Sequence, residues 1–351
     1  MKVAISIAVP GSGGPPWREA VDYVREAERL GVEQVWSAEA WGSDAVTPLA
    51  YLAAVTDTIQ LGSGILQITA RTPVTTAQTA MTLATVSDNR FLLGLGVSGP
   101  QVVEGLHGQP FAHPLGRMRE TIEIIRLAMS GERIVHHGRQ FELPLPGGEG
   151  KALRLGITAD AAVPIWLATL SPKMLELTGE LADGWLGTSF VPEGAEEASI
   201  RHIRAGAERA GRTLADIELA QGGDVAFSDD VEQLIAERKK GLAFSLGGMG
   251  SATTNFYNDA YSRQGWAEAA AAVRDLWVAG RRDEAVAAVP DEMVLQTTML
   301  GTPAMVRDRI RAARAVGIDV LRVYPAGQTL DERIDTVGRV VELVREVSVE
   351  S

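Results

Sequence analysis

The stretch FLLGLGVSGPQVVEG, residues 91–105, carries glycines at positions 94, 96 and 99 after an apolar run. This G-x-G-x-x-G spacing is the fingerprint of dinucleotide-binding Rossmann domains, which place it after their first strand and follow it with an acid about 20 residues later. Here Pro100 comes directly after the last glycine, so we expect the next helix to be delayed. Glu120 stands at about the required distance, but within helix-like sequence rather than at the end of a strand.

Three strand–helix units precede this stretch. Apolar, strand-like runs occupy residues 3–9, 33–39 and 59–66, and helix-like sequence follows each of them. The glycine-containing run, 89–97, is therefore the fourth strand of a series and not the first strand of a Rossmann domain. We interpret its glycines as the end of a parallel strand, where they either let a ligand approach the backbone or allow tight packing.

The same rhythm continues in the second half, with strand-like runs at 163–169, 184–190, 217–228 and 319–325. Eight strands, with a strand first and a helix last, predict an α/β protein with a (β/α)8 TIM barrel as a single domain over residues 1–351. Two segments interrupt the rhythm and are predicted to be insertions. One is rich in Pro and Gly, at about 131–163, and the other is mostly helical, at about 241–293.

The composition narrows the class of function. The formal net charge of -12 disfavours nucleic acid as a partner, because an acidic chain repels phosphate backbones. The chain has no apolar run of the ~20 residues that a membrane span needs. It has no cysteine, which excludes thiolate metal sites and a Cys nucleophile. We read the N-terminal MKVAISIAVPG as a first strand and not as a signal peptide, and we expect a cytoplasmic protein that acts on a small molecule.

The active site of such a barrel lies at the C-terminal ends of its strands. Trp41, after the second strand, and Thr188 and Ser189, after the sixth, are candidates for the substrate pocket. Core packing is an equally good interpretation of Trp41. The fifth strand is followed by Ser171, a candidate N-cap, and by a proline at the first helical position. Backbone N–H groups at a helix start attract anions, and Lys173 adds a positive charge, so a phosphate-bearing cofactor suits this site.

These stretches resemble the luciferase-like monooxygenase superfamily, in particular its coenzyme F420-dependent oxidoreductase branch. The similarity covers most of the chain in order, through WSAEAWGSDAVTPLAYLA, LGSGI, NRFLLGLGVSGPQVVEGLHGQPF, LATLSPKMLELTGELADGW and GSATTNFYN. The resemblance implies a homodimer of barrels that transfers a hydride between C5 of the deazaflavin and an unsaturated, carbonyl or alcohol substrate.

The resemblance also implies the residues that bind the cofactor. A non-prolyl cis peptide at the bond matching Gly64–Ile65 would support the back of the deazaflavin ring. Backbone around Leu66 and Gln67 would hold the ring edge. The phosphate of the cofactor side chain would lie against two loops, with the residues Val97, Ser98, Gly99, Thr169, Leu170, Ser171 and Lys173.

The proton for the reaction would come from Glu39, His107 or water. Glu39, which lies near the ring in relatives, is the first candidate, because a carboxyl group in a mostly apolar mouth is easier to protonate. The alternative is that Glu39 pairs with an arginine as a structural acid. The sugar-phosphate dehydrogenases of the superfamily carry a His and a Trp at the positions of Ala40 and Asp44, which argues against that activity here.

Two other functions remain open. An FMN-dependent luciferase-like monooxygenase would share the fold but use reduced flavin and oxygen, and a barrel that binds the cofactor without turnover is also compatible with these residues. We predict no metal site, because the neighbouring His136 and His137 lack further ligands. The sequence NFYN, residues 255–258, either lines the substrate pocket or pins the second insertion, and we favour the second role.

Overall fold

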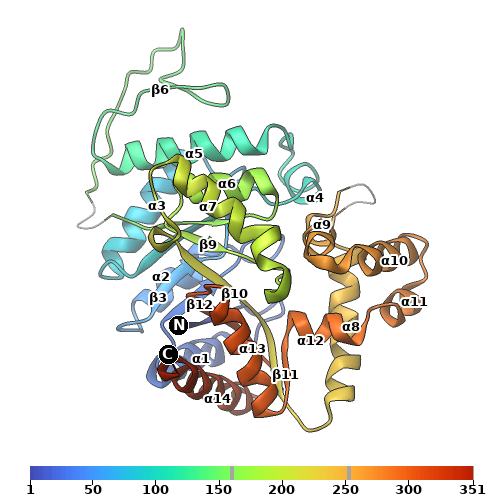
Figure 1. The fold of residues 1–351 in the computed structure, drawn as a ribbon. Helices are drawn as coiled ribbons and strands as arrows, with labels where there is room; N and C mark the ends of the chain where they lie inside the picture. The colour runs from blue at the N-terminus through green and yellow to red at the C-terminus, as the bar shows by residue number, and fades with distance from the viewer. Residues whose placement is uncertain (159–161, 251–253, 351) are drawn as a thin grey trace.

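The computed structural model describes residues 1–158, 162–250 and 254–350, so residues 159–161 and 251–253 of the two predicted insertions lie outside it. Within the described residues, eight parallel strands form a closed barrel, which confirms the predicted fold class (Figure 1). In order around the barrel they are β1 (Lys2–Ile7), β2 (Gln34–Ser37), β3 (Gln60–Ser63), β5 (Phe91–Gly96), β8 (Ile165–Ala168), β9 (Gly184–Leu186), β10 (Glu218–Phe227) and β12 (Val320–Pro325). Pairing of β12 with both β1 and β10 and of β9 with β10 closes the ring.

Helices cover the outside of the barrel. They are α1 (Trp17–Leu30), α2 (Val46–Ala53), α3 (Pro73–Val86), α5 (Pro114–Met129), α6 (Pro172–Leu181), α7 (Arg201–Arg209), α13 (Pro303–Ala315) and α14 (Leu330–Val349), with short helical turns η1 (Pro192–Gly194), η2 (Glu196–Ile200) and η3 (Leu214–Asp216) between some of them. In α1, Val21, Val24 and Ala27 recur at helical spacing and are buried, and the helix ends at Gly31, whose φ of 96° favours glycine. No helix in the described ranges is both long enough and apolar enough to cross a membrane.

Three short elements lie at the C-terminal ends of the strands. β4 (Leu66–Gln67) pairs with β5 after a break in β3. β11 (Met299–Gly301), which the sequence did not predict, pairs with β10. The third element is the short helix α4 (Pro100–Val103), which follows β5.

The expectation that Pro100 delays the next helix is wrong. Helix α4 (Pro100–Val103) begins at this proline, because the first helical position needs no backbone N–H.

The barrel interior is filled by apolar side chains. Trp36 and Trp166 meet edge to face with ring centroids 5.3 Å apart. Ala4, Leu92, Leu186, Ala220 and Val320 belong to the same buried cluster. Because side chains alternate along a strand, Ser6, Asp224 and Tyr324 face the same interior nearer to the C-terminal end. The barrel therefore has an apolar floor and a polar rim on its β1, β10 and β12 side.

The segment after α5 forms a hairpin of β6 (His136–His137) and β7 (Glu142–Leu143), which extends beyond the helices in Figure 1. Glu120 of α5 holds it, since its carboxylate accepts hydrogen bonds from the backbone N–H groups of Arg139, Gln140 and Phe141, each at 2.9 Å. Glu120, which stands at the distance from the glycine motif where a Rossmann domain has its ribose-binding acid, therefore stabilises the hairpin instead.

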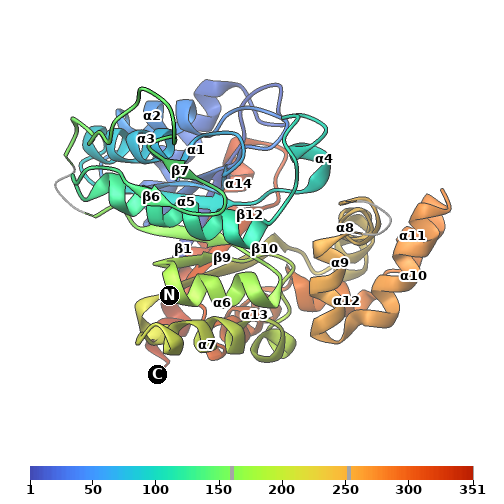
Figure 2. The ribbon, with the colours of Figure 1, turned by 90° about the horizontal axis from the view of Figure 1, so that it is seen from above.

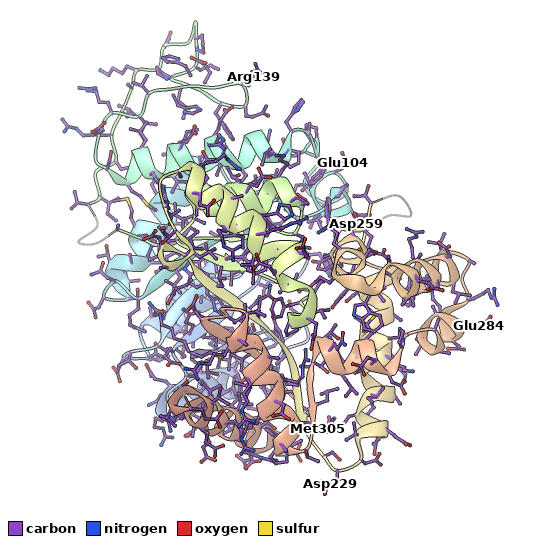
Figure 3. All side chains as sticks on the ribbon, in the orientation of Figure 1. Glu104, Arg139, Asp229, Asp259, Glu284 and Met305 are labelled. Carbon is purple, nitrogen blue, oxygen red and sulfur yellow. The ribbon has the colours of Figure 1, made fainter. Side chains whose placement is uncertain are left out.

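A helical segment leaves the barrel after β10. It comprises α8 (Val231–Gly247), α9 (Phe256–Tyr261), η4 (Ser262–Trp266), α10 (Ala267–Val278), α11 (Arg282–Ala287) and α12 (Asp291–Thr297). Figure 2 shows these helices together at one side of the barrel, and Figure 3 places Glu284 near the outer end of the group. The segment has its own buried cluster, which includes Leu242, Val273 and Met293 and reaches Ala226 and Leu300 of the barrel.

Candidate active site

The first part of the site is the break between β3 and β4. The Gly64–Ile65 peptide bond is cis, at the position that the resemblance indicates. The backbone N–H of Gly64 donates to the Ser37 carbonyl oxygen at 2.7 Å, and a Cβ at Gly64 would lie 3.4 Å from Trp36. The interior tryptophan thus packs against the break.

Glu39 lies beside this break, but its surroundings are not the apolar ones expected from the sequence. Its side chain is 8% exposed and forms an ion pair with Arg71. Its two carboxylate oxygens also lie 3.4 Å from the backbone N–H groups of Gln67 and Ala45. The alternative of a carboxylate paired with an arginine is therefore what the structure shows, and Arg71 is a site residue that the sequence reasoning missed.

Gln67 follows the break and is buried. Its Nε2 donates to the Ala40 carbonyl oxygen at 3.1 Å, whereas its Oε1 is buried and has no hydrogen-bond partner in the described part of the chain. An unsatisfied buried acceptor is unfavourable by about 1–3 kcal/mol, so this oxygen points to a missing donor. The neighbouring Leu66 is buried in the apolar core, and Ile65 packs against the barrel interior.

The three glycines of the sequence fingerprint have different roles. A Cβ at Gly94 would lie 1.8 Å from the Ser63 carbonyl oxygen, and one at Gly96 would lie 2.7 Å from Ile65. Both are required by packing. At Gly99 the nearest atom to such a Cβ is the Gln101 side chain at 3.5 Å, so the space above this backbone is open. Gly99 alone is thus free for the approach of a ligand.

The loop between β5 and α4 has a further unusual residue. Ser98 has a φ of 58°, in the left-handed region that is uncommon for residues other than glycine. Such residues cluster at ligand sites, where the surrounding structure enforces them. Val97, before it, is half-buried and packs against the main core. The loop of residues 97–99 therefore has a defined shape at the mouth.

Helix α6 begins near the mouth, as the sequence predicts. Ser171 is its N-cap and its side chain makes no capping hydrogen bond. The Thr169 hydroxyl already forms a hydrogen bond with the Thr178 hydroxyl at 2.7 Å in the core. Lys173 is exposed and pairs with Glu176 at 3.0 Å, which offsets much of its charge. The helix start remains available to an anion, but Lys173 contributes less than expected.

Two residues of η4 link the helical segment to this side of the barrel. Arg263 Nη2 donates to the Leu170 carbonyl oxygen at 2.7 Å, just before the α6 start, and its Nε is buried with no partner among the described residues. Gln264 Nε2 donates to the Ser189 carbonyl oxygen at 2.6 Å, and Gln264 Oε1 accepts from Val191 N–H at 2.7 Å. Neither residue could be predicted from local sequence, since both bond backbone atoms more than 70 positions away.

The candidates for the substrate pocket divide into exposed and buried residues. Trp41 is 69% exposed, so the core interpretation of this residue is wrong. Thr188 is exposed, whereas Ser189 is buried with a φ of 54°. Burial raises the pKa of the neighbouring Tyr261 to about 12, and the Ser189 side chain acts in the opposite direction. His107 lies in the turn after α4, with a buried Nε2 that has no partner within the described ranges.

The NFYN stretch has two roles. Asn255 and Asn258 are buried, and their side-chain amides donate to the Leu246 carbonyl oxygen at 3.0 and 2.8 Å, which confirms that they pin the helical segment. The aromatic residues between them face other elements. Phe256 contacts Phe111 with ring centroids 6.4 Å apart, so α9 meets the loop after α4. Figure 3 labels Glu104, which follows α4, and Asp259 of α9.

Charged residues occupy the opposite side of the mouth. Asp224 of β10 pairs with Arg238 of α8 at 2.6 Å. Burial raises the pKa of Asp224, and Arg238 opposes that effect. Arg322 Nη1 donates to the Gly187 carbonyl oxygen at 3.1 Å and lies 5.7 Å from the Tyr324 ring centroid. Burial also raises the pKa of Tyr257, and the adjacent Tyr324 acts in the same direction.

The neighbouring histidines of β6 have separate partners. His136 Nε2 lies 3.4 Å from Glu120, and His137 contacts Glu142. The described residues contain no group of three or more His, Cys, Asp or Glu side chains placed to hold a metal ion.

Comparison with known proteins identifies the class of this barrel. The family model of luciferase-like monooxygenases matches residues 1–320. The chain belongs to the luciferase-like monooxygenase family, as the sequence resemblance implies. The chain is therefore an enzyme of this family.

Individual relatives extend the comparison. The chain is 38% identical over 333 residues to a Mycobacterium tuberculosis protein provisionally named a coenzyme F420-dependent oxidoreductase, covering 92% of this chain and 94% of that one. It is 28% identical over 330 residues to a 5,10-methylenetetrahydromethanopterin reductase of Methanolobus tindarius, covering 92% and 95%. The solved structure of the F420-dependent tetrahydromethanopterin reductase of Methanopyrus kandleri superposes with a TM-score of 0.79 over 99% of both chains, at 22% identity, which supports the fold.

Proposed function

We propose that the protein is a coenzyme F420-dependent oxidoreductase that transfers a hydride between C5 of the deazaflavin and an unsaturated, carbonyl or alcohol small molecule. Family membership and the 38% identical relative support this proposal. When bound, F420 supplies the carbon that donates or accepts the hydride, and the protein supplies binding, orientation and exclusion of water.

The orphaned Gln67 Oε1 beside the cis bond is the observation that carries the proposal. The pyrimidine edge of a deazaflavin presents an imide N–H between two carbonyl groups, and an unpaired amide oxygen is a suitable acceptor for that N–H. Residues 64–67 would then hold the ring, with Gly64 and Ile65 behind it. Residues 64–67 are therefore chemically suited to bind the deazaflavin ring of F420.

The side chain of the cofactor also finds suitable partners. The start of α6 at Ser171 offers backbone N–H groups to a phosphate, and Gly99 leaves space for it across the mouth. Arg263 would supply positive charge to the phosphate. Lys173 contributes less, because it is paired with Glu176. We assign the cofactor phosphate to these groups, together with the backbone of Val97 and Ser98.

The proton assignment changes with the structure. Because Glu39 is held by Arg71 and approaches Gln67 N–H, we assign it to positioning of the break rather than to proton transfer. His107, whose Nε2 lacks a partner in the described residues, remains a candidate to donate a proton to the substrate oxygen or carbon, and water is the other. We expect the enzyme to be a homodimer.

The test is a fluorescence titration of the purified protein with F420 and, separately, with FMN at the same salt concentration. We expect micromolar or tighter binding of F420 and weak binding of FMN. A preference for FMN would instead assign the protein to the oxygen-using members of the family. Binding of F420 without hydride transfer to any of a panel of ketones, enones and alcohols would favour a barrel without turnover.

A further inference from the structure

A cavity of about 550 Å³ lies on the side of the mouth away from the Gly64–Ile65 bond. It runs between the loop after β1, the start of α14 and helix α8. This volume is in the range of small-molecule sites. Ile7, Val225, Leu300 and Leu330 are among its apolar lining residues. We call the part lined by strand residues its inner end and the part lined by Tyr23 of α1 and Arg333 of α14 its outer end.

The inner end opens toward the barrel mouth. Ser6, Asp224 and Tyr324 line it, and their strands place these side chains on the interior face of the barrel. Asp224 and Tyr324 are register partners on adjacent strands. A molecule in the cavity would therefore extend toward the interior of the mouth, where the proposed ring site lies on the opposite side.

The outer end carries two hydrogen-bond donors without protein acceptors. Tyr23 is 8% exposed, and its hydroxyl is buried with no partner among the residues that the structure describes. Arg333 is close enough for its charge to oppose the effect of burial on the Tyr23 pKa. The one side-chain hydrogen bond of Arg333 within the described ranges joins its Nε to the Gly327 carbonyl oxygen at 3.0 Å, so both Nη groups are available.

Acidic residues near the cavity do not occupy these donors. Asp224 is paired with Arg238 at the inner end. Glu19 and Glu237 also line the cavity, but both are exposed, so water screens their charges. A doubly charged phosphate would still meet their repulsion, whereas a planar, singly charged carboxylate matches the edge of a guanidinium and needs only these few donors.

We propose that this cavity is the substrate subsite and that it selects an organic carboxylate with an apolar body. The carboxylate accepts hydrogen bonds from Tyr23 Oη and from the Arg333 guanidinium. The apolar body lies along Ile7, Val225 and Leu300 and brings the far end of the molecule to the mouth. This inference rests on the proposed function for the identity of the reaction, but the binding site itself is testable without the cofactor.

The experiment is isothermal titration calorimetry of the cofactor-free protein with octanoate and with octanol, which share an apolar body and differ in the head group. We expect octanoate to bind the wild-type protein more tightly than octanol. Arg333→Gln should weaken octanoate binding by about tenfold or more, and Tyr23→Phe by severalfold, because each removes a donor to a charged acceptor. Neither change should alter the affinity for octanol.

Two controls distinguish loss of the binding site from loss of the folded structure. Arg25→Gln changes an exposed arginine of the same helix as Tyr23 and should leave octanoate binding unchanged. Tyr23→Phe should not lower the melting temperature, since it removes an unpaired buried hydroxyl. Octanoate affinity that is equal in wild type and both variants, or no binding of octanoate to wild type, would overturn the inference.

The same variants distinguish this inference from the proposed function. Both should bind F420 as wild type does, because neither residue lies on the assigned cofactor side. Octanoate binding that depends on Arg333, in a protein that does not bind F420, would uphold the subsite and reject the cofactor assignment.

Discussion

Arg71, in the loop before α3, forms an ion pair with Glu39, two residues after β2, and so joins two loops beside the break that contains the Gly64–Ile65 bond. Arg71 is 21% exposed at its side chain, so water screens the pair only in part. The pair fixes a carboxylate against the backbone of Gln67. The shape of the proposed ring site thus depends on a charge interaction between residues 32 positions apart.

We expect Glu39→Gln to lower F420 affinity and turnover by similar factors, on the order of tenfold, because a charge-assisted contact that orients the break is lost. Fluorescence titration and steady-state kinetics measure the two quantities. Arg71→Met should have the same effect, and the double variant should lose little more than either single one. A large loss of turnover at unchanged affinity would instead identify Glu39 as the proton donor.

Gln67→Met should weaken binding of F420 and of its phosphate-free deazaflavin core by the same factor, about fivefold to twentyfold. The change removes the buried acceptor Oε1 that we assign to the ring N–H, and it keeps the side-chain length. Titration with both compounds measures this effect. Unchanged affinity for both would remove Gln67 from the ring site.

Arg263→Met should weaken F420 binding by about tenfold and leave binding of the phosphate-free core unchanged, because the guanidinium is assigned to the phosphate. The contrast with Gln67→Met is the control, as that change affects both compounds. If Arg263→Met weakened the two compounds equally, the arginine would act through the shape of the Leu170 loop instead.

Gly94→Ala and Gly99→Ala should behave differently although they belong to one sequence fingerprint. The first places a methyl group 1.8 Å from the Ser63 carbonyl oxygen and should lower the free energy of unfolding by about 3 kcal/mol or prevent folding. The second should leave the melting temperature unchanged and weaken F420 binding. Thermal unfolding and titration of the two variants measure this, and equal melting temperatures would contradict it.

Glu120→Gln should lower the melting temperature at neutral pH. Burial raises the pKa of Glu120, but the three backbone N–H groups of the hairpin outweigh it and hold the pKa below its usual range. A depressed carboxyl pKa stabilises the folded state above the unfolded pKa, and this contribution is lost as the pH falls through the folded one. The difference between wild type and variant should therefore shrink below about pH 4. A difference that is constant with pH would reject the ionised contact.

The eight strands were predictable because short strand-like runs alternate with helix-like sequence along the chain, as at 3–9 followed by the amphipathic α1. β11 was missed because three residues carry too weak a pattern. In the site, the α6 start at Ser171 could be located from the local sequence, whereas the break at Gly64 was located only through the family resemblance. The roles of Glu39 and Lys173 could not, since they depend on Arg71 and Glu176, and a side chain's partner is set by the tertiary fold.

The joint between the helical segment and the barrel uses the side chains of Arg263 and Gln264 on one face and main-chain carbonyl oxygens of Leu170 and Ser189 on the other. Every residue type offers the same carbonyl oxygen. Substitutions at positions 170 and 189 that keep the backbone path therefore leave the joint intact. The side chains of the barrel loops can accordingly change while the helical segment stays bound to the barrel. The loops can thus adapt to different substrates without loss of these two hydrogen bonds.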